Sequence, residues 1–148
     1  MTRTALFPGS FNPFTIGHKD IVDRTLATLA DRVIIAIGVN ANKPAADTAD
    51  RLAAIQSIYA DDARVKVCTY SGLTTEFAKQ EGADFIVRGI RNATDLEYEQ
   101  QIAEVNRRLS GIETVMLPTR PELAHVSSSI VRELLSYGIN PQILTGHA

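Results

Sequence analysis

Short apolar segments alternate with longer amphipathic segments along the whole chain. Short apolar segments bounded by polar residues are typical of buried strands. We therefore expect strands at Thr4–Phe7, Val33–Val39, Val65–Tyr70, Phe85–Arg88 and Thr114–Leu117. In the segments between them, apolar residues recur at helical spacing. These segments predict helices at about Gly17–Ala30, Thr48–Ala60, Thr75–Glu81 and Asp95–Leu109, and a last one from near Ser128 to near Gly138.

The alternation of strands and helices predicts an α/β fold. Apolar strands joined by helices favour a mainly parallel sheet that is covered on both faces. With right-handed crossovers, this becomes a Rossmann-like doubly wound sheet of about five mainly parallel strands with helices on both faces. The chain has no repeat, low-complexity segment or long linker, so we expect one domain over residues 1–148. The run Thr94-Asp95-Leu96-Glu97 predicts a capping box for the fourth helix, and Gly138 predicts a C-cap for the last.

Composition limits the classes of function. The formal net charge of −2 argues against nucleic acid or an anionic membrane as the main partner. Cys68 is the only cysteine, which excludes a disulfide scaffold, and its apolar surroundings predict a buried strand residue. The N-terminus leads straight into a strand, and no apolar run has membrane-spanning length. We therefore expect a cytoplasmic protein.

The run Pro8-Gly9-Ser10-Phe11-Asn12-Pro13-Phe14-Thr15-Ile16-Gly17-His18 connects the first strand to the first helix. It predicts a tight glycine turn and a helix N-terminus that carries a histidine. Free backbone N–H groups and the positive end of the helix dipole make such a turn an anion site. The histidine adds a donor that can stabilise charge on a phosphate. The alternative is an ordinary turn with an incidental histidine.

Polar residues also follow the other strands of the predicted sheet. Lys43 follows the second strand, Arg88 and Arg91 the fourth, and Ser127–Ser129 opens the last helix with Arg132 after it. Parallel strands end at one edge, so these groups predict a concave site for several phosphates.

Each group has a simpler interpretation. A loop lysine is often only solvated, the arginines can pair with Asp95, Glu97 or Glu99, and the serines can be an N-cap. The helical spacing of four apolar residues predicts a core or subunit contact; they are Leu96, Ile102, Val105 and Leu109.

The motif at residues 9–18 resembles the signature of the nucleotidyltransferase superfamily. The run from Arg88 to Glu99, the Asn106-Arg107 pair and the run from Val126 to Glu133 resemble bacterial phosphopantetheine adenylyltransferases over nearly the whole chain. The resemblance implies transfer of the adenylyl group of ATP to 4′-phosphopantetheine, which gives dephospho-coenzyme A and pyrophosphate. It also implies a homohexamer, dependence on Mg²⁺ and feedback inhibition by coenzyme A.

The resemblance assigns roles to individual residues. Ser10, His18 and Lys43 are implied to be catalytic, with His18 stabilising the transition state at the α-phosphate. Ser10, Lys43, Thr74 and Arg88 are implied to bind phosphopantetheine. ATP-binding residues are implied to be Ser10, Phe11, His18, Gly89, Ile90, Arg91, Glu99, Leu123, Ala124, His125, Val126, Ser127, Ser128 and Ser129. No residue is expected to ligate a metal. Asn12 departs from the family, which usually has aspartate there, and the loop after Lys43 is one residue short.

The chemistry that the resemblance implies needs no general base, because a phosphate monoester is already ionised near neutral pH. The protein has to neutralise charge and align the attacking and leaving oxygens. Two other functions remain open at this point. One is adenylyl transfer to nicotinate mononucleotide, and the other is non-catalytic ATP binding by a regulator.

Overall fold

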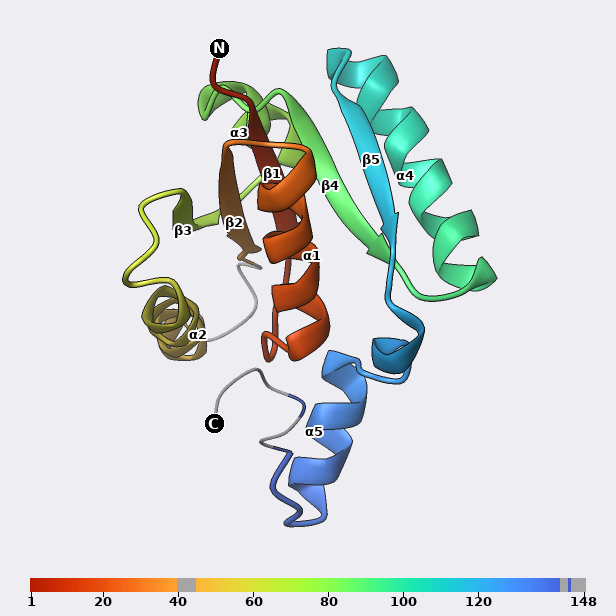
Figure 1. Cartoon of the computed structure of the whole chain (residues 1–148). Coiled ribbons are helices and arrows are strands. Elements are labelled where there is room, and N and C mark those ends of the chain that lie inside the picture. Colours follow the sequence, from red (N-terminus) through yellow and green to blue (C-terminus); the bar gives the residue numbers. More distant parts are fainter. Residues whose placement is uncertain (40–44, 142–143, 145–148) are drawn as a thin grey trace.

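The computed structural model describes residues 1–39, 45–141 and 144. Within these ranges five parallel strands form one sheet in the order β3-β2-β1-β4-β5 (Figure 1). The strands are β1 (Thr4–Gly9), β2 (Arg32–Gly38), β3 (Val65–Tyr70), β4 (Phe85–Ile90) and β5 (Glu113–Pro118). The helices are α1 (Ile16–Thr28), α2 (Ala45–Ile58), α3 (Thr74–Gln80), α4 (Ala93–Ser110), the short 3₁₀ helix η1 (Pro121–Leu123) and α5 (Ser128–Ser136).

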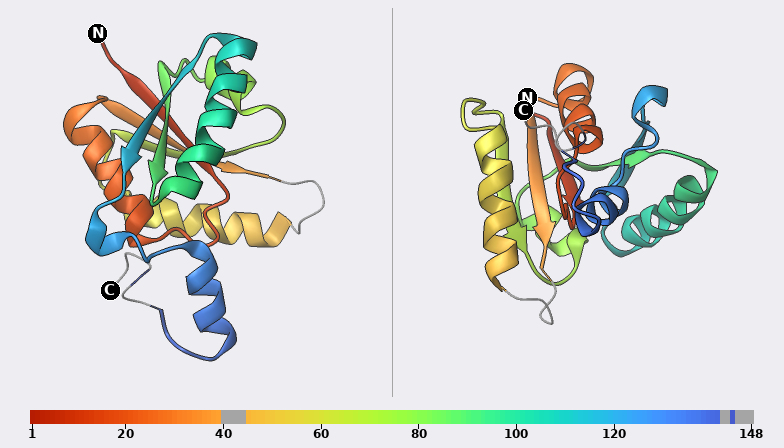
Figure 2. Two further views of the ribbon diagram at one scale, coloured as in Figure 1. Left: turned by 90° about the vertical axis from the view of Figure 1, so that its right-hand side faces the viewer. Right: turned by 90° about the horizontal axis from the view of Figure 1, so that it is seen from below.

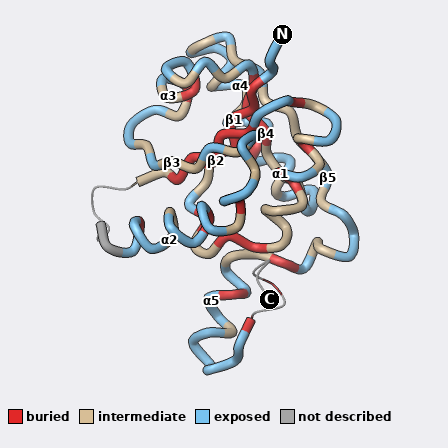
Figure 3. Tube along the Cα trace, turned by 60° about the vertical axis from the view of Figure 1, so that its left-hand side comes forward, coloured by how far each residue is buried: buried red, intermediate tan, exposed pale blue. Residues whose placement is uncertain are grey.

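Helices cover both faces of the sheet, because the three central strands are apolar on both sides (Figures 2 and 3). Successive side chains of a strand point to opposite faces. Phe7 and Ile35 are buried on the face that packs against α1 and α2. Leu6 and Ile34 are buried on the other face, against α3. The expected doubly wound, Rossmann-like fold is therefore confirmed.

The direction of winding reverses between β1 and β4. From β1 the chain moves outward to β2 and β3, and it returns through α3 to β4 on the other side of β1. The connections that leave the carboxyl ends of β1 and β4 therefore diverge and open a crevice, which is where doubly wound sheets bind ligands. Gly9 ends β1 and Ile90 ends β4 at this crevice.

The expected capping box at Thr94 is wrong. Helix α4 begins two residues earlier than expected, and the Asn92 side chain is the N-cap, accepting from the Asp95 N–H at 2.9 Å. Asparagine is as good an N-cap as threonine or better, so α4 begins after Asn92 and not after Thr94. Helix α2 also begins earlier than expected, at Ala45. Helix α5 ends near Gly138, as expected, but its C-cap is Tyr137, and Gly138 is the residue after it, with φ 73°.

Two expectations about burial need correction. Cys68 lies in β3, as expected, but it is half-buried, because β3 is an edge strand of the sheet. The four apolar residues of α4 (Leu96, Ile102, Val105 and Leu109) are exposed by 38–62% and so do not belong to the core. A subunit contact remains the other interpretation. Among the helices that the structure describes, none combines the length and apolar character that crossing a membrane requires.

Candidate nucleotide-binding site

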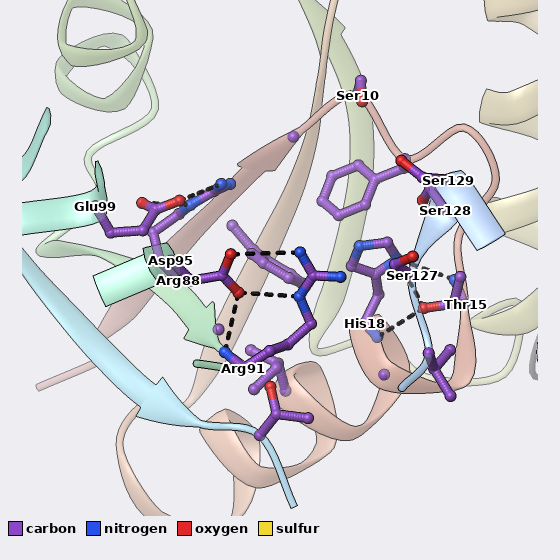
Figure 4. Close-up of a pocket in the computed structure, with 18 of the residues that line it drawn as sticks. Ser10, Thr15, His18, Arg88, Arg91, Asp95, Glu99, Ser127, Ser128 and Ser129 are labelled. Atoms are coloured by element: carbon purple, nitrogen blue, oxygen red, sulfur yellow. Dashed lines mark hydrogen bonds and ion pairs between the residues drawn. The ribbon is translucent and has the colours of Figure 1, made fainter. Parts of the chain in front are cut away.

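A cavity of about 310 Å³ lies in the crevice at the carboxyl ends of β1 and β4 (Figure 4). The loop after β1, the start of α1, the end of β4, the start of α4 and the start of α5 all contribute to its wall. The side chains that supply its polar and charged groups are Ser10, Thr15, His18, Arg88, Arg91, Asp95, Glu99, Thr119, Ser127, Ser128, Ser129 and Arg132. This volume is typical of a site for a small-molecule ligand.

The turn after β1 brings the backbone into the cavity wall. A Cβ atom on Gly9 would lie 3.0 Å from the Phe11 ring, so a larger residue there would force the ring to shift. Phe11 itself has φ 46°, in the left-handed region that non-glycine residues adopt only at a cost. Ser10, between them, is exposed at the cavity edge.

His18 occupies a defined position in the first turn of α1. Thr15 is the N-cap, and its hydroxyl accepts from the His18 N–H, while the Thr15 N–H donates to Nδ1 of His18 at 2.9 Å. This is a capping box in which histidine takes the place of the usual glutamate. Because a backbone N–H can only donate, Nδ1 must accept. The neutral imidazole therefore carries its proton on Nε2.

Aromatic packing and charge keep this imidazole neutral. The rings of Phe7, Phe11 and Phe14 lie with their centroids 5.0–6.2 Å from the centroid of the His18 ring. Burial and then the nearby positive charges of Arg88 and Arg91 lower the pKa of His18 from 6.5 to about 4. At neutral pH His18 can therefore donate one hydrogen bond from Nε2. It does not carry the second proton, which an imidazolium would give up as an acid.

Arg88 and Arg91 both form ion pairs, which was one of the two interpretations that the sequence allowed. Arg88 donates from Nε and Nη2 to the two carboxylate oxygens of Glu99, at 3.0 and 2.7 Å, and from Nη1 to the Pro8 carbonyl. Arg91 donates from Nε and Nη2 to Asp95, at 2.9 and 3.3 Å. Glu97 takes no part in these two pairs. The carboxylates hold both guanidinium groups at the cavity wall (Figure 4).

The three serines at the start of α5 each have a partner. Ser127 is the N-cap and accepts from the Ile130 N–H, Ser128 donates to the Pro13 carbonyl at 2.7 Å, and the Ser129 hydroxyl accepts from Arg132. The N-cap interpretation is therefore confirmed. Backbone N–H groups in the first turn of a helix lack helical partners, so they can still face an anion.

A second cavity, of about 180 Å³, adjoins the first. Gly9, Arg88 and Glu99 line both cavities. Thr74 lines the second, where its hydroxyl lies 2.8 Å from the Tyr70 hydroxyl. The structure thus brings Thr74 and Arg88, two of the four residues expected to bind phosphopantetheine, to one cavity.

The structure distributes the expected site residues in four ways. The first cavity is lined by Ser10, Phe11, His18, Arg88, Gly89, Arg91, Glu99, Val126, Ser127, Ser128 and Ser129, and the second by Thr74, Arg88 and Glu99. Ile90, Leu123, Ala124 and His125 lie outside the lining of both cavities. Lys43 lies outside the described residues. Thr15 and Thr119 line the first cavity without having been expected there; the spacing of Thr15 and His18, that of a capping box, was the signal for Thr15.

The described residues offer no cluster of three histidine, cysteine or acidic side chains that could hold a metal ion. The two cavity carboxylates, Asp95 and Glu99, already accept from arginines. Mg²⁺ usually keeps waters and binds through phosphates together with one or two carboxylates. The described side chains therefore offer a metal ion two arginine-paired carboxylates at most, so an ion in this cavity would need phosphate oxygens as further ligands.

The sequence and the fold match known proteins. A family model described as cytidylyltransferase-like matches residues 6–134. The phosphopantetheine adenylyltransferase of Phocaeicola vulgatus is 54% identical over 137 residues, which cover 92% of this chain and 90% of that protein. The phosphopantetheine adenylyltransferase of Flavobacterium psychrophilum is 47% identical over 147 residues, covering 99% and 97%.

Among solved structures, a bifunctional NMN adenylyltransferase/ADP ribose pyrophosphatase from Francisella tularensis, complexed with AMP and a manganese ion, has a similar fold. The TM-score is 0.69 at 17% identity, over 99% of this chain and 45% of that one. At this identity the likeness concerns the fold alone. The extent of the sequence matches shows that the chain belongs to the phosphopantetheine adenylyltransferase family, within the cytidylyltransferase-like proteins.

Proposed function

We propose that this protein transfers the adenylyl group of ATP to 4′-phosphopantetheine, reversibly, giving dephospho-coenzyme A and pyrophosphate in coenzyme A biosynthesis. Membership of the family supports the reaction. The observation that carries the proposal is the pair of adjoining cavities that share Arg88 and Glu99. Two substrates that must react through their phosphates need two adjoining sites with positive charge where they meet.

In this proposal ATP binds in the first cavity, where the Arg91 guanidinium and the N–H groups at the start of α5 face its phosphates. Phosphopantetheine binds in the second cavity, its phosphate directed towards Arg88. Ser10 lies at the edge of the first cavity, next to Gly9, which lines both. Lys43 would neutralise the attacking phosphate, which stays a prediction because the residue lies outside the described part of the chain.

The proposed step is an in-line displacement at the α-phosphorus. An oxygen of the 4′-phosphate forms a bond to the α-phosphorus of ATP, and the bond from that phosphorus to the β-phosphate bridging oxygen breaks. Pyrophosphate leaves with that electron pair, and no proton needs to be removed from the attacking dianion. His18 donates from Nε2 to an α-phosphate oxygen as charge moves through the transition state. Positioning of the two substrates can supply roughly 7–11 kcal/mol of the barrier reduction.

Further proposals concern the state of the protein. Mg²⁺ would enter as the ATP complex and neutralise phosphate charge. Coenzyme A, which carries the same pantetheine arm as the product, would act as a feedback inhibitor by occupying the second cavity. We also propose that the protein works in the cytoplasm as a homohexamer. The exposed apolar side chains of α4 support a contact between subunits.

The test is release of pyrophosphate from Mg-ATP with each of two acceptors, 4′-phosphopantetheine and nicotinate mononucleotide, and with none. Release that depends on 4′-phosphopantetheine is expected. Release only with the mononucleotide would keep the fold and the role of His18 but overturn the substrate. Binding of ATP without release under any condition would favour the non-catalytic regulator.

A further inference from the structure

Arg51 connects α2 to the turn that follows β1. Its Nη1 donates to the Ser10 carbonyl at 2.6 Å, across 41 residues of sequence. Its Nη2 donates to the Thr48 hydroxyl at 3.2 Å, and its Nε donates to the Asp47 carbonyl at 3.3 Å. The guanidinium is thus fixed to the first turns of its own helix and holds one carbonyl of the turn. Arg51 lines neither cavity, so it reaches the turn from outside the site.

The bond to Ser10 fixes the orientation of one peptide group. The Ser10 carbonyl and the Phe11 N–H belong to the same planar trans peptide, so they point in opposite directions. Because the carbonyl is held by Arg51, which lines neither cavity, the Phe11 N–H points away from that arginine. The left-handed φ of 46° at Phe11 is a costly conformation, which a hydrogen bond of this kind helps to hold.

Two other arginines hold backbone carbonyls nearby, one at the end of β1 and one in the turn itself. Arg88 donates to the carbonyl of Pro8, and Arg132 donates to that of Asn12 at 2.6 Å. Both of these arginines line the first cavity, whereas Arg51 does not. Arg51 is therefore the member of this group whose removal changes the turn without removing a charge from the cavity wall.

We propose that Arg51 is a positioning residue for nucleotide phosphates, which holds the Ser10–Phe11 peptide with its N–H presented to the first cavity. The proposal rests on the proposed function. Consecutive backbone N–H groups in turns that include a left-handed residue form concavities that bind anions. A peptide flipped the other way would place a carbonyl oxygen against the phosphates and repel them. Donors that are already oriented need no reorganisation when charge develops.

A lysine at this position cannot hold the Ser10–Phe11 peptide in the same orientation. Its single ammonium group is a point charge on a flexible stem, whereas the planar guanidinium binds three acceptors at fixed angles. Arg51→Lys therefore keeps the charge and loses the fixed orientation. Arg64 offers a matched control, because it pairs with Asp62 in a turn and its side chain is 58% exposed.

The experiment compares wild type, Arg51→Lys, Arg51→Ala and Arg64→Ala at 25 °C. ATP affinity is measured by calorimetry, turnover by pyrophosphate release and folding by circular dichroism. We expect Arg51→Ala to stay folded and to lose about tenfold or more in kcat/KM for ATP, a difference of about 1.4 kcal/mol. Millimolar guanidinium should restore part of the loss. The kcat/KM of Arg51→Lys should lie between those of wild type and Arg51→Ala. The kcat/KM of Arg64→Ala should match that of wild type with or without guanidinium.

An NMR titration that follows the Phe11 amide proton distinguishes a positioning role of Arg51 from a merely structural one. On titration with inorganic pyrophosphate, the Phe11 amide proton should shift in wild type and much less in folded Arg51→Ala. An equal shift in both, or wild-type ATP affinity in Arg51→Ala, would overturn the proposal. If wild type forms no product with 4′-phosphopantetheine, the proposed function fails, while the ATP affinities and the amide shift still decide the role of Arg51.

Discussion

The backbone N–H of Thr15 donates to Nδ1 of His18 at 2.9 Å, and this bond determines how the imidazole can act. Protonation of Nδ1 would set two donors against each other. The aromatic rings around His18 and the positive charges of Arg88 and Arg91 disfavour the imidazolium as well. His18 is therefore suited to donate a hydrogen bond to a phosphate, and it is not suited to exchange protons with it.

Replacement of His18 tests this role. We expect His18→Ala to lower kcat by about a hundredfold or more, because one well-placed transition-state donor is worth about 2.7–4 kcal/mol. ATP affinity should change little, since the donor acts mainly in the transition state. His18→Gln, which keeps an N–H donor, should lose less. Steady-state kinetics with calorimetric ATP binding decide the matter; unchanged turnover in His18→Ala would remove this residue from the mechanism.

The lowered pKa of His18 predicts a pH dependence of stability. The unfolded chain takes up a proton on this side chain below about pH 6.5, and the folded protein only below about 4. The unfolded state thus binds more protons between these values, so stability is lost as the pH falls through this window. A shift of this size is worth about 2 kcal/mol between pH 7 and pH 5.

The measurement is the free energy of unfolding in urea at pH 7 and pH 5, for wild type and His18→Gln. Carboxylates titrate in both proteins, so the difference between them isolates the histidine. Wild type should lose more stability than the variant. Equal losses would mean that His18 is not held neutral in the folded protein.

The pair between Arg88 and Glu99 predicts a coupled effect on stability and binding. The Glu99 side chain is 8% exposed and that of Arg88 is 31% exposed. We expect Glu99→Gln to destabilise the fold by about 2–3 kcal/mol, because a largely buried pair is broken while Arg88 keeps some access to water. The KM for both substrates should rise, since Arg88 lines both cavities.

Glu104 provides the control for this prediction. It pairs with Arg107 and Arg108 on the exposed side of α4, and its side chain is 46% exposed. Glu104→Gln should cost less than about 1 kcal/mol and leave both KM values unchanged. Urea unfolding and steady-state kinetics of the two variants give the comparison. Equal effects at positions 99 and 104 would argue against a special role for the buried pair.

Exposed apolar residues of α4 predict a subunit contact. Val105 and Leu109 are 55% and 62% exposed. If the protein is a hexamer through this face, Val105→Asp or Leu109→Asp should lower the mass measured by light scattering to that of smaller species. Leu135→Asp, at a residue of α5 that is 56% exposed, should leave the mass unchanged. A wild-type monomer, or a hexamer that survives both α4 changes, would exclude this contact.

The sequence predicted the fold because burial sets the pattern of strands such as β1 and β2, and that pattern can be read locally. The edge of the sheet that carries His18, Arg88 and Ser127 followed from the rule that parallel strands end together. The start of α4 was harder to predict, because Asn92 and Thr94 are both good N-cap residues. In the structure the helix begins after Asn92. The exposure of Cys68 depended on which strand became the edge.

Contacts between distant segments could not be predicted. Nothing in the neighbourhood of Arg51 or Ser10 indicates that the two meet across 41 residues, because the folding of α2 over the sheet creates that bond. The adjoining of the two cavities at Arg88 likewise depends on how α3 and α4 pack. The tautomer of His18 could have been predicted, because the spacing of Thr15 and His18 is that of a capping box.

The most direct test is a competition in one reaction. The protein is incubated with Mg-ATP and equal concentrations of 4′-phosphopantetheine and nicotinate mononucleotide, and the adenylylated products are identified by mass. Dephospho-coenzyme A as the dominant product, with an equal amount of pyrophosphate, is the predicted result. Adenylylated mononucleotide as the dominant product, or no product of either kind while ATP is bound, would contradict the proposed function.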